Sequence, residues 1–173
     1  MLIAIISDTH DNLSNLEKFL NWAKKNKIEM IIHCGDIASS ETIRYLAQNF
    51  NGPLHLVYGN MDEPRRDEIY EAIDGLKNVT LHGDIGEIVV ETHNYASLRI
   101  AFCHFPEKAK ALAESGKYNL VFYGHTHKPW METRENNCQL INPGTLAGLF
   151  SKATFAVYDT KSGKLELKVL EFI

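Results

Sequence analysis

The sequence has no long hydrophobic run, few cysteines and no excess of basic residues. No apolar segment approaches the roughly 18 residues that suggest a membrane-spanning helix, so we expect no membrane partner. Residues 1–6 include no basic residue, and Asp8 follows too early for a secretory signal. The three cysteines (Cys34, Cys103 and Cys138) make an odd number and follow no zinc-finger spacing. Together these absences predict a cytoplasmic protein with reduced thiols.

The charge balance also argues against a nucleic-acid partner. The chain carries 22 acidic and 18 basic residues, for a formal net charge of −4, so duplex nucleic acid is not an expected partner. Its 173 residues, 45% of them hydrophobic, are close to the commonest size of one domain. No repeat, low-complexity segment or Pro/Gly-rich linker divides them. We therefore predict a single domain over residues 1–173, and leave open whether copies of it form a homo-oligomer.

The first half of the chain alternates short apolar runs with helical patterns, as parallel strands joined by helices do. The apolar runs predict strands at Leu2–Ile6, Met30–His33 and Leu54–Tyr58. The helical patterns predict helices around residues 16–23, over Ser40–Gln48 and from Pro64 to near Gly75. Ser14 and Glu17 have capping-box spacing and predict the start of the first helix.

The second half is mostly strand. Its apolar and alternating segments predict strands at Val79–His82, Ile85–Glu91, Leu98–Cys103, Leu120–Tyr123, Gln139–Ile141, Thr154–Tyr158 and Leu165–Leu170. One helix is expected, over Pro106–Ser115, closed by Gly116. Parallel strands joined by helices and then a mostly antiparallel run indicate two sheets packed together, with helices outside.

The sequence is rich in histidine, with eight in all, and several follow predicted strands. Five buried strands are each followed, within four residues, by candidate metal ligands: Asp8 and His10, Asp36, Asn60, His104, and His125 and His127. In open α/β sheets, ligands bind beyond the carboxyl ends of the strands, so we expect these side chains to converge. The spacing of His125 and His127 would point both imidazoles to one side of an extended chain.

Each of these residues alone has an ordinary structural explanation. Asp8 could cap a turn, Asp36 and Asn60 could be turn residues, and His104 could be a hydrogen-bonded core histidine. The joint pattern outweighs these readings. Seven groups are too many for one tetrahedral ion and suit two ions that share one carboxylate. Carboxylate, imidazole and amide donors favour manganese, iron, nickel or zinc over magnesium or calcium.

The full set of motifs resembles the calcineurin-like metallophosphoesterases. The resemblance rests on Asp8-x-His10, Gly35-Asp36, Gly59-Asn60, His104 and Gly124-His125-Thr126-His127. The short chain and Asn142-Pro143-Gly144-Thr145 are similar to the small phosphodiesterase branch of bacteria and archaea. The resemblance implies an α/β fold, a four-layer α/β/β/α sandwich of two mixed sheets flanked by helices. It also implies a metal-dependent phosphoesterase that hydrolyses a small or nucleotide-like phosphodiester.

The resemblance further implies a role for each residue. One metal would be held by Asp8, His10, Asp36 and His127, and the other by Asp36, Asn60, His104 and His125. Asp36 would bridge the two ions, which we expect to be manganese, with nickel, iron or zinc as alternatives. Asp36, Asn60 and His104 would act in catalysis, with a metal-bridging hydroxide as the nucleophile. Asn60 and Asn12 would hold a phosphate oxygen.

Two positions depart from the family pattern. Family members often carry a proton-donating histidine after the asparagine of the third motif, but here Met61 stands there, followed by Asp62 as a rival donor. Loss of a general acid costs about 10²–10⁴-fold, so we expect weak turnover except with acidic leaving groups. His104 is followed by Phe105 and Pro106, where glycine is frequent, and these residues could restrict the site.

Two other functions remain open. The same motifs are similar to the scaffold subunit of retromer, so a protein-interaction scaffold is one alternative, which the complete ligand set disfavours. A phosphomonoesterase is the other, because the same metal centre supports both reactions.

Several further residues lie outside the expected ligand set. We interpret His33, His55, His82 and His93 as strand or surface histidines. Cys34 and Cys103 adjoin the ligands and are either a redox switch or small packing residues, and burial of free cysteine favours packing. Trp130 and Met131 could form an interface or a stacking surface, or be isolated exposed side chains.

Overall fold

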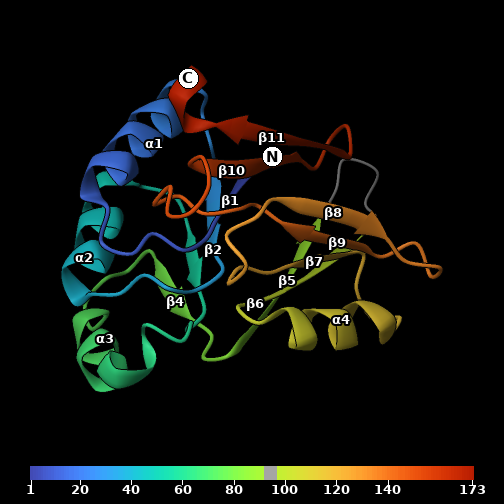
Figure 1. Ribbon diagram of the computed structural model, residues 1–173, viewed down its shortest axis with the longest axis horizontal. Helices are drawn as coiled ribbons and strands as arrows, with labels where there is room; N and C mark the ends of the chain where they lie inside the picture. Colours follow the sequence, from blue (N-terminus) through green and yellow to red (C-terminus); the bar gives the residue numbers. More distant parts are fainter. Residues whose placement is uncertain (92–96) are drawn as a thin grey trace.

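The computed structural model describes residues 1–91 and 97–173, which form two β-sheets packed face to face (Figure 1). The first sheet has the strand order β11-β10-β1-β2-β3-β4. Its strands are β1 (Leu2–Ile6), β2 (Met30–His33), β3 (Leu54–Leu56), β4 (Val79–Leu81), β10 (Thr154–Asp159) and β11 (Lys164–Val169). β1 to β4 pair in parallel, and the two C-terminal strands pair antiparallel.

The second sheet has the order β5-β6-β7-β9-β8 and is also mixed. Its strands are β5 (Ile85–Glu91), β6 (Ser97–Cys103), β7 (Leu120–Phe122), β8 (Trp130–Thr133) and β9 (Gln139–Asn142). β6, β7 and β9 are parallel, and the two edge strands pair antiparallel.

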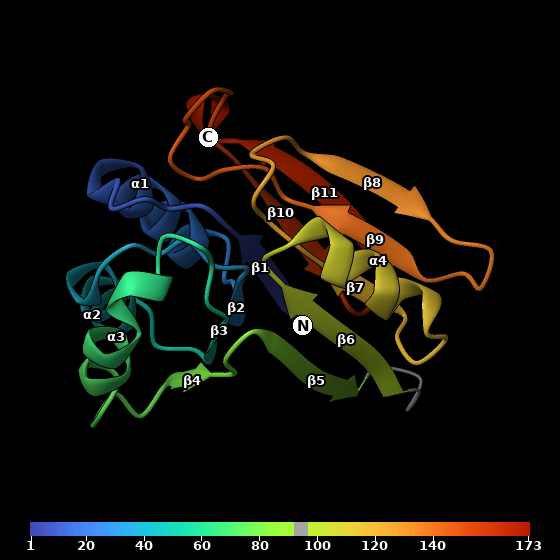
Figure 2. The same cartoon turned by 60° about the horizontal axis from the view of Figure 1, so that its bottom comes forward.

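Helices cover the outer faces of both sheets (Figures 1 and 2). Beside the first sheet lie α1 (Leu13–Lys25), α2 (Ser40–Asn49) and α3 (Arg66–Ala72), and beside the second lies α4 (Pro106–Glu114). Short 3₁₀ turns occur at Glu63–Arg65 and Leu170–Phe172. The expected four-layer α/β/β/α sandwich of two mixed sheets is confirmed.

Successive side chains of a strand point to opposite faces of its sheet, so one strand contributes to two apolar cores. On β1, Ile3 and Ile5 join the core between the two sheets, whereas Ala4 and Ile6 pack on the helix side with Leu16 of α1. A third apolar cluster joins the outer face of β6 and β7 to α4. Because β1 is buried on both faces, its sequence is continuously apolar, as expected of a central parallel strand.

Two expectations about the elements need correction, and one strand was not expected. The first helix is capped by Asn12, whose Oδ1 accepts a hydrogen bond from the backbone N–H of Asn15 at 3.1 Å, so the capping box at Ser14 is wrong. Strand β8 was not expected, because Trp130 and Met131 are both exposed and the segment has no alternating apolar pattern. Pro64 lies in the 3₁₀ turn before α3, not in the helix itself.

Two further expectations concern a histidine and membrane-spanning helices. His93 lies outside the described residues, so its assignment as a strand or surface histidine stays a prediction. Within residues 1–91 and 97–173, none of the helices combines the length and apolar character that a membrane span requires.

Removal of divalent metal ions should leave this fold intact, because three apolar layers stabilise it without an ion, unlike a small zinc domain. We expect the far-ultraviolet circular dichroism spectrum in excess EDTA to match that of the metal-loaded protein. Loss of ellipticity in EDTA that returns on adding metal would instead show that ions hold the fold together.

Candidate metal centre

The loops that follow β1, β2 and β3 of the first sheet meet those that follow β6 and β7 of the second. Backbone hydrogen bonds join the first two loops, since Asp8 N donates to Gly35 O and Thr9 N to Asp36 O, both at 3.0 Å. Gly124 N donates to His104 O at 3.1 Å and so joins the last two. The structure therefore brings all seven predicted ligand residues to one place.

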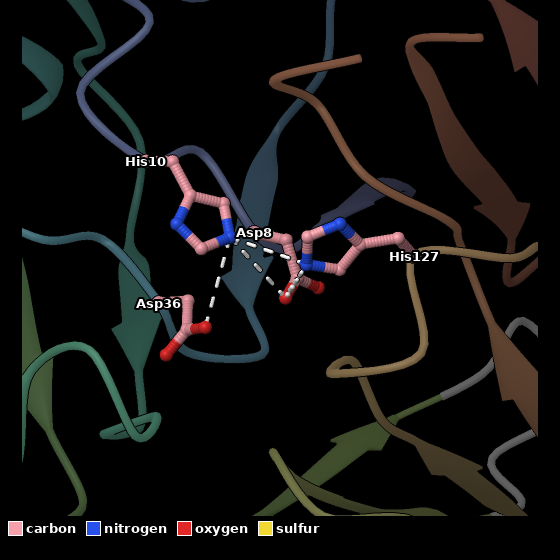
Figure 3. A group of neighbouring side chains, drawn as sticks. All are labelled: Asp8, His10, Asp36 and His127. Carbon is pink, nitrogen blue, oxygen red and sulfur yellow. Dashed lines mark hydrogen bonds and ion pairs between the residues drawn. The ribbon is translucent and has the colours of Figure 1, made fainter. Parts of the chain in front are cut away.

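The first ligand group comprises Asp8, His10, Asp36 and His127, which point toward one another (Figure 3). One candidate donor atom from each of these residues lies within 4.8 Å of the others. His127 Nε2 is 3.1 Å from Asp8 Oδ1 and 3.2 Å from His10 Nε2. His10 Nε2 is 3.7 Å from Asp36 Oδ2.

The second ligand group comprises Asp36, Asn60, His104 and His125. Asn60 Oδ1 lies 3.0 Å from His104 Nε2 and 2.9 Å from His125 Nδ1, and these two nitrogens are 3.3 Å apart. Asp36 Oδ1 is 3.5 Å from His104 Nε2. Asp36 thus turns Oδ2 toward the first ligand group and Oδ1 toward the second.

The arrangement of donor atoms fits divalent metal ions. Asp8 Oδ1 is buried and accepts no hydrogen bond from the described residues, although its other oxygen accepts one from His125 N at 3.1 Å. A buried carboxylate oxygen without a partner is costly, and a cation in the first ligand group would satisfy it. In both groups, imidazole nitrogens and oxygens lie close enough together to bind one ion, and no thiolate is among them. Such a donor set suits transition metals.

Hydrogen bonds orient two of the imidazoles for such a role. His104 Nδ1 is 2.9 Å from the carbonyl of Cys34, and His127 Nδ1 is 3.3 Å from that of Leu149. A carbonyl can only accept, so each Nδ1 carries the proton and each Nε2 keeps its lone pair for the ligand group. This partnering of the second nitrogen is typical of metal-binding histidines.

The local charges favour the ionised carboxylate. Burial raises the pKa of Asp8, but His127 and His104 beside it outweigh burial, and the net shift is downward. The adjacent carboxylate of Asp8 raises the pKa of His127 against the opposing effect of burial.

The ligand loops adopt unusual backbone conformations. Asp8, Asp36 and His127 have φ values of 53°, 57° and 58°, in the left-handed region that non-glycine residues seldom occupy. His125 shares this region, with φ of 69°, so the segment from His125 to His127 is not extended. The expectation that both imidazoles lie on one side of an extended chain is therefore wrong: His125 joins the second ligand group and His127 the first.

Two motif glycines are explained by close approach. A Cβ on Gly59 would lie 2.2 Å from Asp36 Oδ1, and one on Gly124 would lie 2.0 Å from Ser7 Oγ. A side chain at either position would displace the carboxylate-bearing loops.

Asp62 has a structural role that the sequence did not indicate. Its side chain is fully buried, and Oδ2 accepts hydrogen bonds from Asp36 N at 2.9 Å and Gly59 N at 2.8 Å, while Oδ1 accepts from Ala38 N at 2.8 Å. Burial raises the pKa of Asp62 against the lowering effect of these backbone donors. Because both oxygens accept from buried N–H groups, Asp62 joins the second and third motif loops and is unsuited to donate a proton.

His33 also supports the site. Gly35 N donates to His33 Nδ1 at 3.2 Å, so the neutral ring carries its proton on Nε2, which lies 2.6 Å from Thr9 Oγ1. Burial lowers its pKa to about 3, which keeps the ring neutral. His33 is thus a buried residue that connects the loops after β1 and β2.

Other residues from the sequence analysis are placed as follows. Asn12 uses Oδ1 to cap α1 and donates from Nδ2 to Ala147 O at 3.0 Å, so both its polar groups bind the chain. All three cysteines are free and buried, and burial raises the pKa of Cys103 to about 12, as suits packing residues.

Two histidines lie away from the centre, and one phenylalanine lies beside it. His55 and His82 lie 2.9 Å apart on β3 and beyond β4, outside both ligand groups. Phe105 packs against the second ligand group, with its ring 5.1 Å from that of His125.

The chain belongs to the calcineurin-like phosphoesterase superfamily, whose domain model matches residues 1–163. This establishes the class of protein that the fold and the ligand residues define, and confirms the family resemblance. Membership supports a metal-dependent phosphoesterase.

Individual relatives agree with this assignment. The chain is 31% identical to the phosphodiesterase MJ0936 of Methanocaldococcus jannaschii over 172 residues, which is 99% of this chain and 100% of the relative. A solved archaeal phosphodiesterase matches with a TM-score of 0.84 and 30% identity, covering 98% of this chain and 99% of that one. Vps29 of Chaetomium thermophilum matches with a TM-score of 0.70 at 18% identity, over 98% of this chain and 94% of that one, and shares the fold.

Replacement of Asp62 by alanine should destabilise the protein by about 3 kcal/mol or more, because three buried N–H groups lose their acceptor. Urea unfolding measures this loss, and Asp74→Ala, at an exposed aspartate, is the matched control. An Asp62→Ala protein as stable as the control would contradict the role assigned to the carboxylate.

Proposed function

We propose that the protein hydrolyses a phosphodiester carrying a small or nucleotide-like group, with two divalent transition-metal ions. The observation that carries this proposal is the position of Asp36, which turns one oxygen to each of two ligand groups. The likeness to a phosphodiesterase of M. jannaschii over nearly the whole chain supports the diester as substrate.

Each ligand group would hold one ion. The first ion would be bound by Asp8, His10, Asp36 and His127, and the second by Asp36, Asn60, His104 and His125. Manganese is the first candidate, and nickel, iron or zinc are alternatives with the same preference for nitrogen and oxygen donors. When bound, the two ions would activate a water as nucleophile and would neutralise charge on the phosphoryl oxygens.

The residues of the chain position the reacting groups. In the hydrolysis, a water oxygen bonds to phosphorus and loses a proton to solvent, the bond from phosphorus to one ester oxygen breaks, and that oxygen takes up a proton to give the alcohol. Asn60 is exposed and turns Oδ1 toward the histidines, which leaves its amide nitrogen to donate to a phosphate oxygen. We assign this contact to Asn60 rather than Asn12, whose polar groups are both occupied.

The residue at the position of the family's proton-donating histidine is unsuited to protonate the leaving group. Met61 is 49% exposed, and its thioether cannot donate a proton. Its backbone N–H instead donates to Asp36 Oδ1 at 2.8 Å. The leaving oxygen would depart as an anion or take a proton from solvent, which favours esters of acidic alcohols.

Metal-loaded protein should hydrolyse bis(p-nitrophenyl) phosphate faster than p-nitrophenyl phosphate, and faster with Mn²⁺, Ni²⁺ or Zn²⁺ than with Mg²⁺. Asp36→Asn should weaken binding of both ions and lower the activity by more than about 100-fold. Substituting a residue that only hydrogen-bonds to a metal ligand costs up to about 100-fold, and the loss of a bridging ligand should cost more. Steady-state kinetics and metal analysis of the dialysed proteins measure these effects, with Asp74→Asn as control.

Three outcomes would contradict the proposal. Faster hydrolysis of the monoester would assign a phosphomonoesterase, and no hydrolysis of either ester by fully loaded protein would favour a scaffold. An Asp36→Asn protein that keeps one ion at full affinity would exclude the bridging role.

The rate should depend steeply on the acidity of the leaving group. Met61→His should accelerate esters of weakly acidic alcohols by up to about 100-fold and nitrophenyl esters little, because a general acid matters most for poor leaving groups. The measurement is kcat/KM over a series of substituted phenyl phosphodiesters for wild type, Met61→His and the control Met61→Leu. A shallow dependence in wild type would show that a proton donor is already present.

A further inference from the structure

Phe150 is the most exposed large apolar side chain among the described residues, at 97%. Its ring lies beside the first ligand group, with its centroid 5.8 Å from that of His127 and the two planes 33° apart. A side chain this exposed adds little to the apolar core, so its place beside His127 has no explanation in the stability of the fold.

The backbone holds Phe150 at this place in a strained conformation. Phe150 has φ of 63°, which is rare for a bulky residue and costs on the order of 1–3 kcal/mol. The flanking chain is fixed to the ligand loops, because Ser151 Oγ donates to His127 O at 2.8 Å and Ala147 N donates to Asp8 O at 3.0 Å. A strained, exposed ring on an anchored loop indicates a functional contact rather than a packing one.

The other aromatic ring at the centre is used differently. Phe105 is partly buried and lies edge-on to His104, at a centroid distance of 5.0 Å and an angle of 80°. Its ring is therefore part of the wall behind the second ligand group. Phe150, by contrast, is free to be covered by a planar group that approaches from solvent.

We propose that Phe150 determines specificity by stacking on an aromatic group, aryl or nucleobase, in the part of the phosphodiester that stays bonded to phosphorus after hydrolysis. The proposal rests on the proposed function, since the phosphoryl group would be held at the ligand groups. Aromatic pairs interact at centroid distances of about 4.5–7 Å, and stacking of bases on aromatic side chains is tolerant of their identity. An alkyl ester has no face to cover the ring and would gain nothing from it.

Kinetics with a constant leaving group isolate this contact. Three p-nitrophenyl phosphodiesters differ only in the retained group: thymidine 5′-, phenyl and methyl. Wild type should favour an aromatic retained group, and Phe150→Ala should lower kcat/KM for that substrate about tenfold, within the range for losing one stacked ring. The methyl ester should change less than about twofold, since it makes no such contact.

Matched variants separate stacking from other effects. Phe150→Trp should keep the preference, and Phe150→Leu, which keeps apolar bulk without a ring, should lose it. Tyr70→Ala removes a ring that is 69% exposed on α3, outside the site, and should change nothing. A preference for the thymidine ester over the phenyl ester assigns a nucleobase, and the reverse assigns a simple aryl group. Equal losses for the aromatic and methyl esters, or no loss, would overturn the proposal.

A binding measurement decides the proposal even if no diester is hydrolysed, and so separates it from the proposed function. Calorimetric titration of Mn²⁺-loaded protein with phenylphosphonate and methylphosphonate uses ligands whose carbon–phosphorus bond resists hydrolysis. Wild type and Tyr70→Ala should bind phenylphosphonate about tenfold more tightly than methylphosphonate. Phe150→Ala should bind the two phosphonates with equal affinity. Equal affinities in wild type, or a difference that survives in Phe150→Ala, would overturn the stacking role.

Discussion

The position of the Asp36 carboxylate is the constraint on which the rest of the site depends. Its backbone N–H is held by Asp62, its Oδ1 accepts from Met61 N, and its carbonyl accepts from Thr9 N. Gly59 has no side chain, and any Cβ there would collide with the carboxylate. These contacts leave Asp36 one orientation, with an oxygen toward each ligand group.

This orientation matters because each ligand group combines residues from both sheets. The loops after β1, β2 and β3 supply one side of the centre, and those after β6 and β7 supply the other. Apolar side chains such as Ile5 and Phe102 pack between the sheets and set their separation. The spacing of the two ligand groups therefore depends on packing of the core, and hydrogen bonds hold the strained loops at Asp8 and His127.

The sequence sufficed for the two-sheet architecture and for the convergence of the candidate ligand residues, because both follow from strand-like runs and from what comes directly after them. Asp62 and Phe150 show where such reasoning stops. The role of Asp62 depends on three backbone N–H groups from two loops, and the place of Phe150 depends on its own left-handed backbone conformation. Strand β8 was missed because it is exposed on most positions and carries no alternating pattern. The pattern of apolar and polar residues indicates burial and spacing along the chain. It does not indicate which backbone groups from distant segments form hydrogen bonds.

The most direct test of the account is an anomalous difference map from crystals of the protein loaded with Mn²⁺. The account predicts two peaks about 3.5–4 Å apart, one within the first ligand group and one within the second, with an Asp36 oxygen bound to each. A single peak at full metal occupancy, or two peaks of which only one contacts Asp36, would contradict it.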